Sequence, residues 1–394
     1  MRHTFLPFPT VMSGFVAVLV GYASSAAIIW QAATAAGATA NQIAGWMTML
    51  GIAMGASSLI LSCWYRIPVL TAWSTPGAAL LATSLHGLTI NDAIGVFVFA
   101  NLLIVLCGVT GLFARLMKII PHSLAAAMLA GILLRFGLDA FTNLQGHLAL
   151  TGTMLVCWVV ARRIAPRYAI VFALLVGLVI CAMTGSIDTR HIDTHFVIPQ
   201  WVTPHFSLPA LLGVGVPFFL VTMASQNAPG VATMKASGYH LPVSLLMVVT
   251  GTLSLLLSPF GVFSVCIAAI TAAICQSPEA HPDAQQRWKA SAMAGVFYLL
   301  AGLSGATITS LMAAVPQAWI QTLAGLALLG TISGSLVQAL NIPHQRDAAI
   351  ITFLITASGV TLGGVESAFW GLIAGGVCYA YLAPKARMAE GVQP

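Results

Sequence analysis

The chain has 394 residues, of which 15 are Lys or Arg and 9 are Asp or Glu, so that 6% of the side chains are charged while 59% are hydrophobic. Soluble domains carry about 25% charged residues, disordered chains combine high charge with low hydrophobicity, and disulfide scaffolds are short and dense in cysteine, so these three classes are excluded. The basic residues are scattered between apolar runs instead of lying on one face, which argues against nucleic acid as a partner. The composition therefore indicates a protein that crosses the lipid bilayer many times.

In chain order, twelve apolar runs have the length of ordinary transmembrane helices, about 17 to 25 residues. Two more, 67–85 and 259–276, are long enough to cross but are interrupted in the middle. Counting all fourteen, with both termini in the cytoplasm, places 13 of the 15 basic residues on the cytoplasmic side and leaves only Arg135 and Arg190 outside. This distribution obeys the positive-inside rule. Omitting the interrupted runs would place Arg115, Lys118, Arg162, Arg163 and Arg167 outside, so both runs are expected to cross.

The two halves of the chain resemble each other. Pro121 precedes the sequence Leu-Ala-Gly at 129–131, and Pro316 precedes the same three residues at 323–325, an offset of about 194 residues that the interrupted runs share closely. Each half then contains seven spans. Because seven is odd, the second half enters the membrane in the opposite sense, which gives the inverted repeat that is typical of secondary transporters.

These patterns predict an all-α polytopic membrane protein with fourteen transmembrane segments in a 7+7 inverted repeat. The first repeat is expected over 1–184 and the second over 206–394, with a polar linker at 185–205 on the outer side. The patterns Gly51 to Gly55 and Gly371 to Gly375 have the GxxxG spacing that predicts close helix packing.

The first interrupted run carries the signal for a helix that begins inside the membrane. Thr71 and Trp73 suit an extended stretch, Thr75 after Ser74 is a good N-cap, and Pro76 is a good first helical residue. The sequence thus predicts a short extended stretch followed by a half-helix.

The second interrupted run has a similar pattern without the proline. Val262, Phe263 and Val265 favour extended backbone, and Ser264 can cap the helix that follows. Irregular backbone at membrane depth is tolerated only where it is buried in protein or lines a cavity. Because the two half-helices approach the midplane from opposite sides, their N-termini are expected to converge and attract an anion.

Polar residues at a similar depth occur in the first and eighth spans. Tyr22, Ser24 and Ser25 lie in the first, and Gln226 and Asn227 lie in the eighth, just before a Pro-Gly break. Such side chains also join helices by hydrogen bonds, and for the two serines this structural role is as well supported as a ligand role. The adjacent amides are favoured as site residues.

Enzyme motifs are absent from the sequence. Neither HExxH nor GxSxG occurs, and none of the four lysines follows a glycine, which excludes a Walker A loop. The selectivity sequence TVGYG of potassium channels does not occur. All acidic residues map to loops or span ends, so that no midplane carboxylate is expected to relay protons. We expect a secondary transporter that needs no cofactor or metal.

Four stretches, 21–31, 71–81, 223–230 and 272–283, resemble the benzoate:proton symporter family, and the similarity covers essentially the whole chain. It implies the fold of nucleobase/ascorbate and sulfate-permease-type transporters, a multi-pass protein of the bacterial inner membrane that works by elevator-type alternating access. It also implies a mobile core of spans 1–4 (about 10–113) and 8–11 (about 206–307). The gate would consist of spans 5–7 (about 114–184) and 12–14 (about 308–384).

The same resemblance implies uptake of an aromatic carboxylate such as benzoate together with a proton, and a homodimer as a possible assembly. In nucleobase relatives, acidic residues on spans 8 and 10 bind substrate, whereas here Gln226, Asn227 and the region of Ser264 stand in those neighbourhoods. The absence of these acidic residues favours an anionic substrate, because carboxylates at the site would repel it. Another small anion or a nucleobase remains the alternative substrate, and an anion channel ranks last. The candidate substrate-binding residues are Tyr22, Ser24, Ser25, Trp73, Ser74, Thr75, Gln226, Asn227, Phe263 and Ser264.

Overall fold

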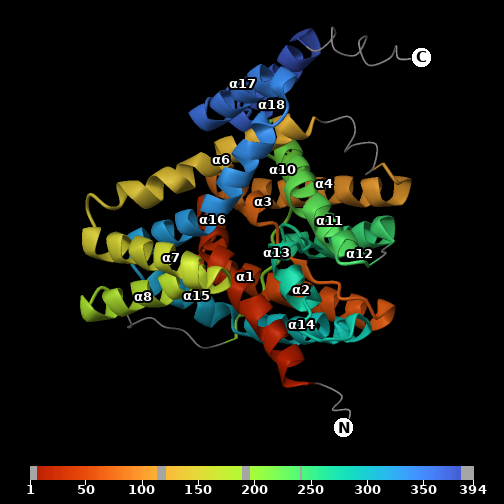
Figure 1. The fold of residues 1–394 in the computed structure, drawn as a ribbon. Coiled ribbons are helices and arrows are strands. Elements are labelled where there is room, and N and C mark those ends of the chain that lie inside the picture. The colour runs from red at the N-terminus through yellow and green to blue at the C-terminus, as the bar shows by residue number, and fades with distance from the viewer. Residues whose placement is uncertain (1–6, 113–120, 189–195, 240–241, 383–394) are drawn as a thin grey trace.

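The computed structural model describes residues 7–112, 121–188, 196–239 and 242–382, and it is mostly helical (Figure 1). Within these residues, seven helices are long and apolar enough to cross a membrane, or eight if the bent pair that meets at Ser304 with an angle of 64° is one span. The chain is therefore a polytopic helical membrane protein. Figure 1 shows α17 and α18 at one end of the molecule and α2 with α14 at the other, with α1, α3, α10 and α13 between them.

The elements of the first half are α1 (Phe8–Ala35), α2 (Ala40–Tyr65), β1 (Thr71–Ala72), α3 (Thr75–Ser84), α4 (Ile90–Thr110), α6 (His122–Thr142), η1 (Leu148–Gly152), α7 (Thr153–Ile164), η2 (Pro166–Tyr168) and α8 (Ala169–Met183). The second half begins with α9 (Leu208–Ala210), η4 (Leu211–Gly215), α10 (Val216–Thr222), η5 (Met223–Asn227) and α11 (Ala228–Ala236). These five form one continuous helix of 29 residues, which we call the 208–236 helix.

The chain continues with α12 (Val243–Leu257), η6 (Ser258–Phe260), β2 (Cys266–Ile267), α13 (Ile270–Gln276), η7 (Ala284–Gln286), α14 (Trp288–Leu303), α15 (Gly305–Ala314), α16 (Gln317–Leu340), η8 (Pro343–Gln345), α17 (Arg346–Ser358) and α18 (Ser367–Leu382). Each predicted segment has a helix or a strand–helix pair in its place. The number of segments that cross a membrane, and the division into core and gate, stay predictions. Some of the basic residues used for the topology lie outside the described residues: Arg2, Arg115, Lys118, Arg190, Lys385 and Arg387.

The two interrupted segments meet in the protein interior. β1 pairs antiparallel with β2, with Thr71 opposite Ile267 and Ala72 opposite Cys266, and the N–H of Ala268 donates to the carbonyl of Leu70 at 2.9 Å. All six of these strand and flanking residues are buried. The short ladder satisfies backbone groups that would otherwise be unpaired in an apolar interior.

The structure corrects three local predictions. The N-cap of α3 is Ser74, whose Oγ accepts from the N–H of Gly77 at 3.0 Å, so Thr75 is the first helical residue and not the cap. Ser264 caps no helix, because strand β2 follows it and α13 begins at Ile270 without a side-chain cap. The predicted Pro-Gly break of span 8 is also wrong, since Pro229 and Gly230 lie inside the continuous 208–236 helix.

Close helix packing at both GxxxG patterns is confirmed. A Cβ atom built on Gly51 would lie 2.5 Å from the Cα of Gly302, and one built on Gly55 would lie 2.8 Å from the carbonyl oxygen of Gly295, so α2 and α14 touch backbone to backbone. Likewise, Cβ atoms on Gly371 and Gly375 would collide with threonines of α17. Small residues allow these approaches where packing and not the hydrophobic effect drives association.

Loop contacts fall into two groups. On one face, the linker donates from Val202 N to Pro259 O and from His205 N to Asn91 O, each at 2.9 Å; we call this the linker face. On the opposite face, the Tyr239 hydroxyl donates to the carbonyl of Ala284 at 2.9 Å, and Ser123 bonds to Gln345. Each contact joins loops that the predicted topology places on the same side.

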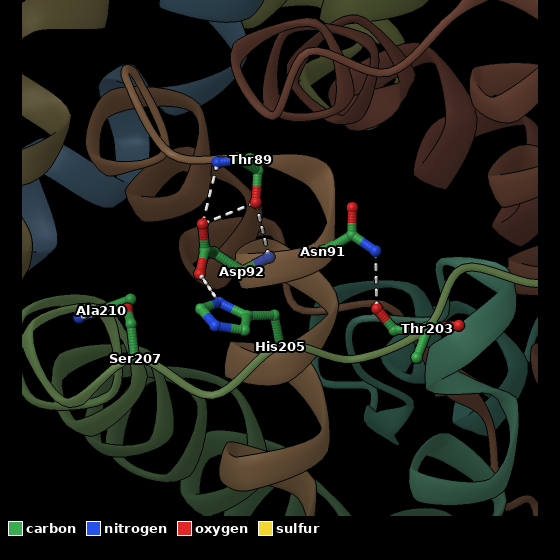
Figure 2. Close-up of polar contacts among 7 residues, drawn as sticks. All are labelled: Thr89, Asn91, Asp92, Thr203, His205, Ser207 and Ala210. Carbon is green, nitrogen blue, oxygen red and sulfur yellow. Dashed lines mark hydrogen bonds and ion pairs between the residues drawn. The ribbon is translucent and has the colours of Figure 1, made fainter.

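The linker is held against the start of α4 (Figure 2). Asp92 closes a capping box with Thr89, and its other carboxylate oxygen lies 2.6 Å from Nδ1 of His205. The Asn91 amide donates to the carbonyl of Thr203 at 2.8 Å. Gly95 lets the linker approach, because a Cβ atom there would overlap the carbonyl oxygen of His205. The linker is thereby fixed to the start of α4 by side-chain contacts of Asn91 and Asp92 and by the close backbone approach at Gly95.

Gly230→Ala should destabilise the fold, because the added Cβ would collide with the carbonyl oxygen of Ile267 in β2. Overpacking of this kind costs roughly 1 to 3 kcal/mol, which would lower the Tm of the purified protein by several degrees. Gly376→Ala in α18 is the matched control, since no atom lies within 4 Å of its Cβ position. Equal melting temperatures for the two variants would show that the helix does not press against β2.

The topology can be tested with single cysteines at the exposed residues Ser304 and Gln285. In intact cells, an impermeant thiol reagent should label Ser304→Cys and not Gln285→Cys, because the predicted topology places them on opposite sides of the membrane. Labelling of Gln285→Cys from outside would remove the fourteen-segment topology. Labelling of both positions after cell lysis serves as the positive control.

Candidate functional site

A cavity of about 470 Å³ lies between α6, α16 and the 208–236 helix. Its lining residues are His122, Ala125, Ala126, Leu129, Ala224, Ser225, Ala228, Pro229, Ala232, Thr331, Gly334, Ser335 and Gln338. The volume is in the range of small-molecule sites, about 300 to 1,000 Å³. His122 and Gln338 lie near the contact of Ser123 with Gln345, so the cavity extends toward the face opposite the linker.

The polar part of the lining suits an anion. Thr331, Ser335 and Gln338 follow the i, i+4, i+7 spacing of one helix face, and His122 and Ser225 lie across from them. No acidic side chain is among the lining residues. The walls therefore offer hydroxyl, amide and imidazole donors without a carboxylate that would repel a negatively charged ligand.

Two adjacent amide side chains of the 208–236 helix, Gln226 and Asn227, lie in different environments. Its π-helical turn η5 spans Met223–Asn227, and such turns occur frequently at functional sites. Ser225 faces the cavity and Gln226 is partly exposed. Asn227 is 1% exposed, and its Oδ1 accepts from the N–H of Ile267 at 3.1 Å. Asn227 thus ties the helix to β2.

The candidate residues of the first and third spans form one cluster. The indole N–H of Trp73 donates to Ser25 Oγ at 2.7 Å, and Ser25 Oγ donates to the carbonyl of Gly21 at 2.7 Å. The Tyr22 ring meets the Trp73 ring edge to face at 4.8 Å. The Tyr22 hydroxyl is buried and has no hydrogen-bond partner within the described part of the chain, so its donor is unused. Ser24 bonds to Gly21 of its own helix.

Three further candidates join the interrupted segments. The N–H of Ser74 donates to Ser264 Oγ at 3.2 Å, and Thr222 of α10 donates to Ser74 Oγ at 3.4 Å. Phe263 is fully buried between Phe97 and Phe218 at centroid distances of 6.1 and 6.3 Å. These contacts support the crossing point, whereas Thr75 at the start of α3 is partly exposed.

The structure brings the candidates together around the ladder of β1 and β2. Helix α3, which follows Trp73 in the chain, packs against α6 and η5, two elements that line the cavity. None of the ten candidate residues from the sequence is itself among the residues that line the cavity. Sequence analysis missed His122, Thr331, Ser335 and Gln338. The polar stripe at helical spacing on an otherwise apolar span could have indicated the last three, whereas nothing local to His122 could.

Asn227→Ala should lower stability, because it leaves the buried N–H of Ile267 without its acceptor. The cost of such a group is about 1 to 3 kcal/mol, measurable as a lower Tm of the purified protein. Gln226→Ala, one residue earlier and partly exposed, is the control and should melt close to wild type. An unchanged Tm for Asn227→Ala would mean that this amide does not hold β2.

Comparison with known proteins gives a consistent result. The family described as "Benzoate membrane transport protein" (BenE) matches residues 4–381. The inner membrane protein YdcO of Escherichia coli K12 is 65% identical over 382 residues, covering 97% of this chain and 98% of its own. The benzoate membrane transport protein of Acinetobacter baylyi is 35% identical over 376 residues, covering 95% of each chain.

Two solved structures resemble this chain in fold. The transmembrane domain of the cyanobacterial bicarbonate transporter BicA has a TM-score of 0.61 at 15% identity, covering 93% of this chain and 97% of that one. The murine anion transporter Slc26a9 in its inward-facing state has a TM-score of 0.63 at 14% identity, covering 98% of this chain and 69% of that one. At these identities the likeness shows the fold alone.

Proposed function

Because the chain belongs to the benzoate membrane transport family and is a membrane transporter, not an enzyme, we propose that it takes up an aromatic carboxylate of the benzoate type by secondary active transport. The observation that carries this proposal is the cavity of about 470 Å³, which is lined by uncharged or imidazole donors. One of its walls is the 208–236 helix, which also contacts strand β2 through Asn227. The proposed setting is the bacterial inner membrane, because the E. coli relative is an inner membrane protein. Both termini are proposed to lie in the cytoplasm, on the basis of the positive-inside rule.

The proposed site offers one set of groups to the ring of a benzoate-like ligand and another set to its carboxylate. The Tyr22 and Trp73 rings, packed edge to face, offer an apolar aromatic surface for a ring. The unpartnered Tyr22 hydroxyl, the partly exposed Gln226 amide and Thr75 at the start of α3 offer donors to a carboxylate. Helix α3 adds the positive end of its dipole. Ser24, Ser25, Ser74, Asn227, Phe263 and Ser264 act as supports that hold these groups in place.

Alternating access would move the core against the gate. The cavity lies between the 208–236 helix, which is a core element in the predicted division, and the gate helices α6 and α16. Five of the thirteen lining residues are alanines, all on α6 and the 208–236 helix, and small side chains allow one surface to slide past another with little interlocking. The proposed movement carries the Trp73 cluster and the crossed strands as one body.

Proton coupling is proposed to involve the substrate's own carboxyl group, or a proton that travels with the anion. No carboxylate lines the cavity, and a bare anion entering against an inside-negative potential would cost about 2.3 kcal/mol per 100 mV. Electroneutral uptake avoids this cost.

Uptake of labelled benzoate into proteoliposomes tests the proposal. An inward proton gradient should drive uptake, and an imposed potassium-diffusion potential should have little effect. Strong acceleration of uptake by an inside-negative potential would contradict electroneutral coupling. Competition by uracil but not by benzoate analogues would indicate a nucleobase, and not an aromatic carboxylate, as the substrate class.

Tyr22→Phe tests the donor role directly. Removing a hydroxyl that has no partner in the described part of the chain should leave the Tm unchanged but weaken benzoate binding by roughly 1 kcal/mol, or about fivefold. Tyr298→Phe, a neighbour whose ring lies 6.1 Å from that of Tyr22, is the control and should keep wild-type affinity. Binding of benzoate by Tyr22→Phe at wild-type strength would place the carboxylate elsewhere.

A further inference from the structure

A tight turn between α17 and α18 forms a rigid projection on the linker face. Leu362 and Val365 exchange two backbone hydrogen bonds of 3.1 and 3.0 Å, and Gly363 and Gly364 have φ angles of 61° and 75°. Positive φ at both central residues is the geometry of a two-residue hairpin turn, which glycine adopts without strain. The indole N–H of Trp370 donates to the carbonyls of Leu362 and Val365 at 3.2 and 3.1 Å, which fixes the turn to the start of α18.

This turn presses against the 208–236 helix. A Cβ atom on Gly213 would lie 2.7 Å from the backbone nitrogen of Glu366 and 3.1 Å from the Cα of Val365, and a Cβ on Gly364 would lie 3.5 Å from Pro209. The contact sits in η4, and the cavity begins at Ala224 of the same helix. At 1.5 Å per residue, Gly213 and Ala228 lie about 22 Å apart along the axis. The 208–236 helix is thus tightly packed near Gly213 and borders the cavity from Ala224 onward.

Glu366 follows the turn and precedes the first residue of α18. Its backbone nitrogen lies in this contact and the residue is partly buried. Burial raises the pKa of its carboxyl, with no charged neighbour contributing. The other titratable groups on the elements that pack around the contact and on the adjoining linker are Asp92, Cys107, His122, Arg135, Asp139, His205, Lys235, Arg346, Asp347, Cys378, Tyr379 and Tyr381. None of them contributes to the shift of the Glu366 carboxyl. A carboxylate buried without a counter-charge is favoured in its neutral form.

We propose that the 362–366 turn is the latch that closes the core–gate interface on the linker face, and that the Glu366 carboxyl is a proton-binding site that controls it. Closing the latch buries Glu366 and so favours the protonated acid, whereas opening exposes the carboxyl to water and favours the carboxylate. Closed latches therefore predominate at low pH and are lost as pH rises through the pKa of the closed state. Because Glu366 stays at the linker face, its proton returns to that side and adds none to the transported stoichiometry.

This inference rests on the proposed alternating access but not on the identity of the substrate. The latch is tested by double electron–electron resonance, which measures the distance between two spin labels. The labels are attached at the exposed residues Thr361 and Phe206, one on each side of the latch. The labels are placed in a background in which Cys63, Cys157 and Cys378, the cysteines that are not buried, are replaced by serine. Purified protein in lipid nanodiscs is measured without substrate between pH 5 and 8.

In the wild type, the ratio of short to long distances should fall as pH rises, by at most tenfold per pH unit for one proton. Glu366→Gln should keep the short distance at every pH, and Asp347→Asn, at the far end of α17, should titrate as the wild type does. Gly213→Ala should favour the long distance at every pH, because its Cβ has no room against Glu366.

A Glu366→Gln protein that titrates like the wild type, or a wild type whose distances do not change with pH, would overturn the proposal. The distance measurement contains no benzoate and so is independent of the substrate. If the wild type does not transport benzoate but the pH dependence of the distances is lost in Glu366→Gln, the proposed substrate is wrong and the latch is still supported. Proteoliposome uptake by Glu366→Gln that is still driven by a proton gradient would support the separation of latch and coupling.

Discussion

The pairing of two short strands from opposite halves of the chain is the constraint on which the rest of the structure depends. A membrane interior offers no water to unpaired backbone groups, so each interrupted segment needs a partner, and β1 and β2 supply it for each other. The hydroxyl and amide groups of Ser74, Ser264 and Asn227 extend this pairing to the neighbouring helices. Helix α3 can then begin inside the protein, beside the cavity, without loss of backbone hydrogen bonds.

The crossing point also explains how the polar residues divide into supports and ligand-facing groups. Side chains that complete the backbone pairing are buried and have their partners inside the protein, as Asn227 has in Ile267. Groups without such a task, such as the Tyr22 hydroxyl, keep an unused donor. No carboxylate lines the cavity wall, so a small number of unpaired dipoles would be enough for the proposed selection of an anion.

The two ends of the 208–236 helix show opposite packing. Near its start, glycine lets the 362–366 turn approach the backbone closely, and farther along, alanines and polar side chains leave a cavity. A rigid helix that is tightly packed at one end and borders a cavity at the other suits a transporter. A small rotation of the helix can open the packed end and close the cavity. The conformation with its cavity away from the linker is therefore one member of the expected cycle.

The sequence by itself determined the membrane class, the family, the order of the segments and the two places where the backbone had to be irregular, because hydrophobic length, basic-residue placement and proline and glycine signals act locally along the chain. It also predicted Trp73 and Gln226 as substrate-binding residues, which stays a prediction because neither is among the residues that line the cavity. Only the tertiary structure decided that Ser74 and not Thr75 caps α3, that Ser264 holds Ser74 instead of capping a helix, and that Asn227 is committed to β2. It also decided that Thr331, Ser335 and Gln338 face the same cavity as Ser225. The Ser74 cap is a local contact with Gly77, but the roles of Ser264 and Asn227 depend on contacts between residues 190 and 40 positions apart, and the geometry of such contacts is set by how the helices pack and not by any local pattern.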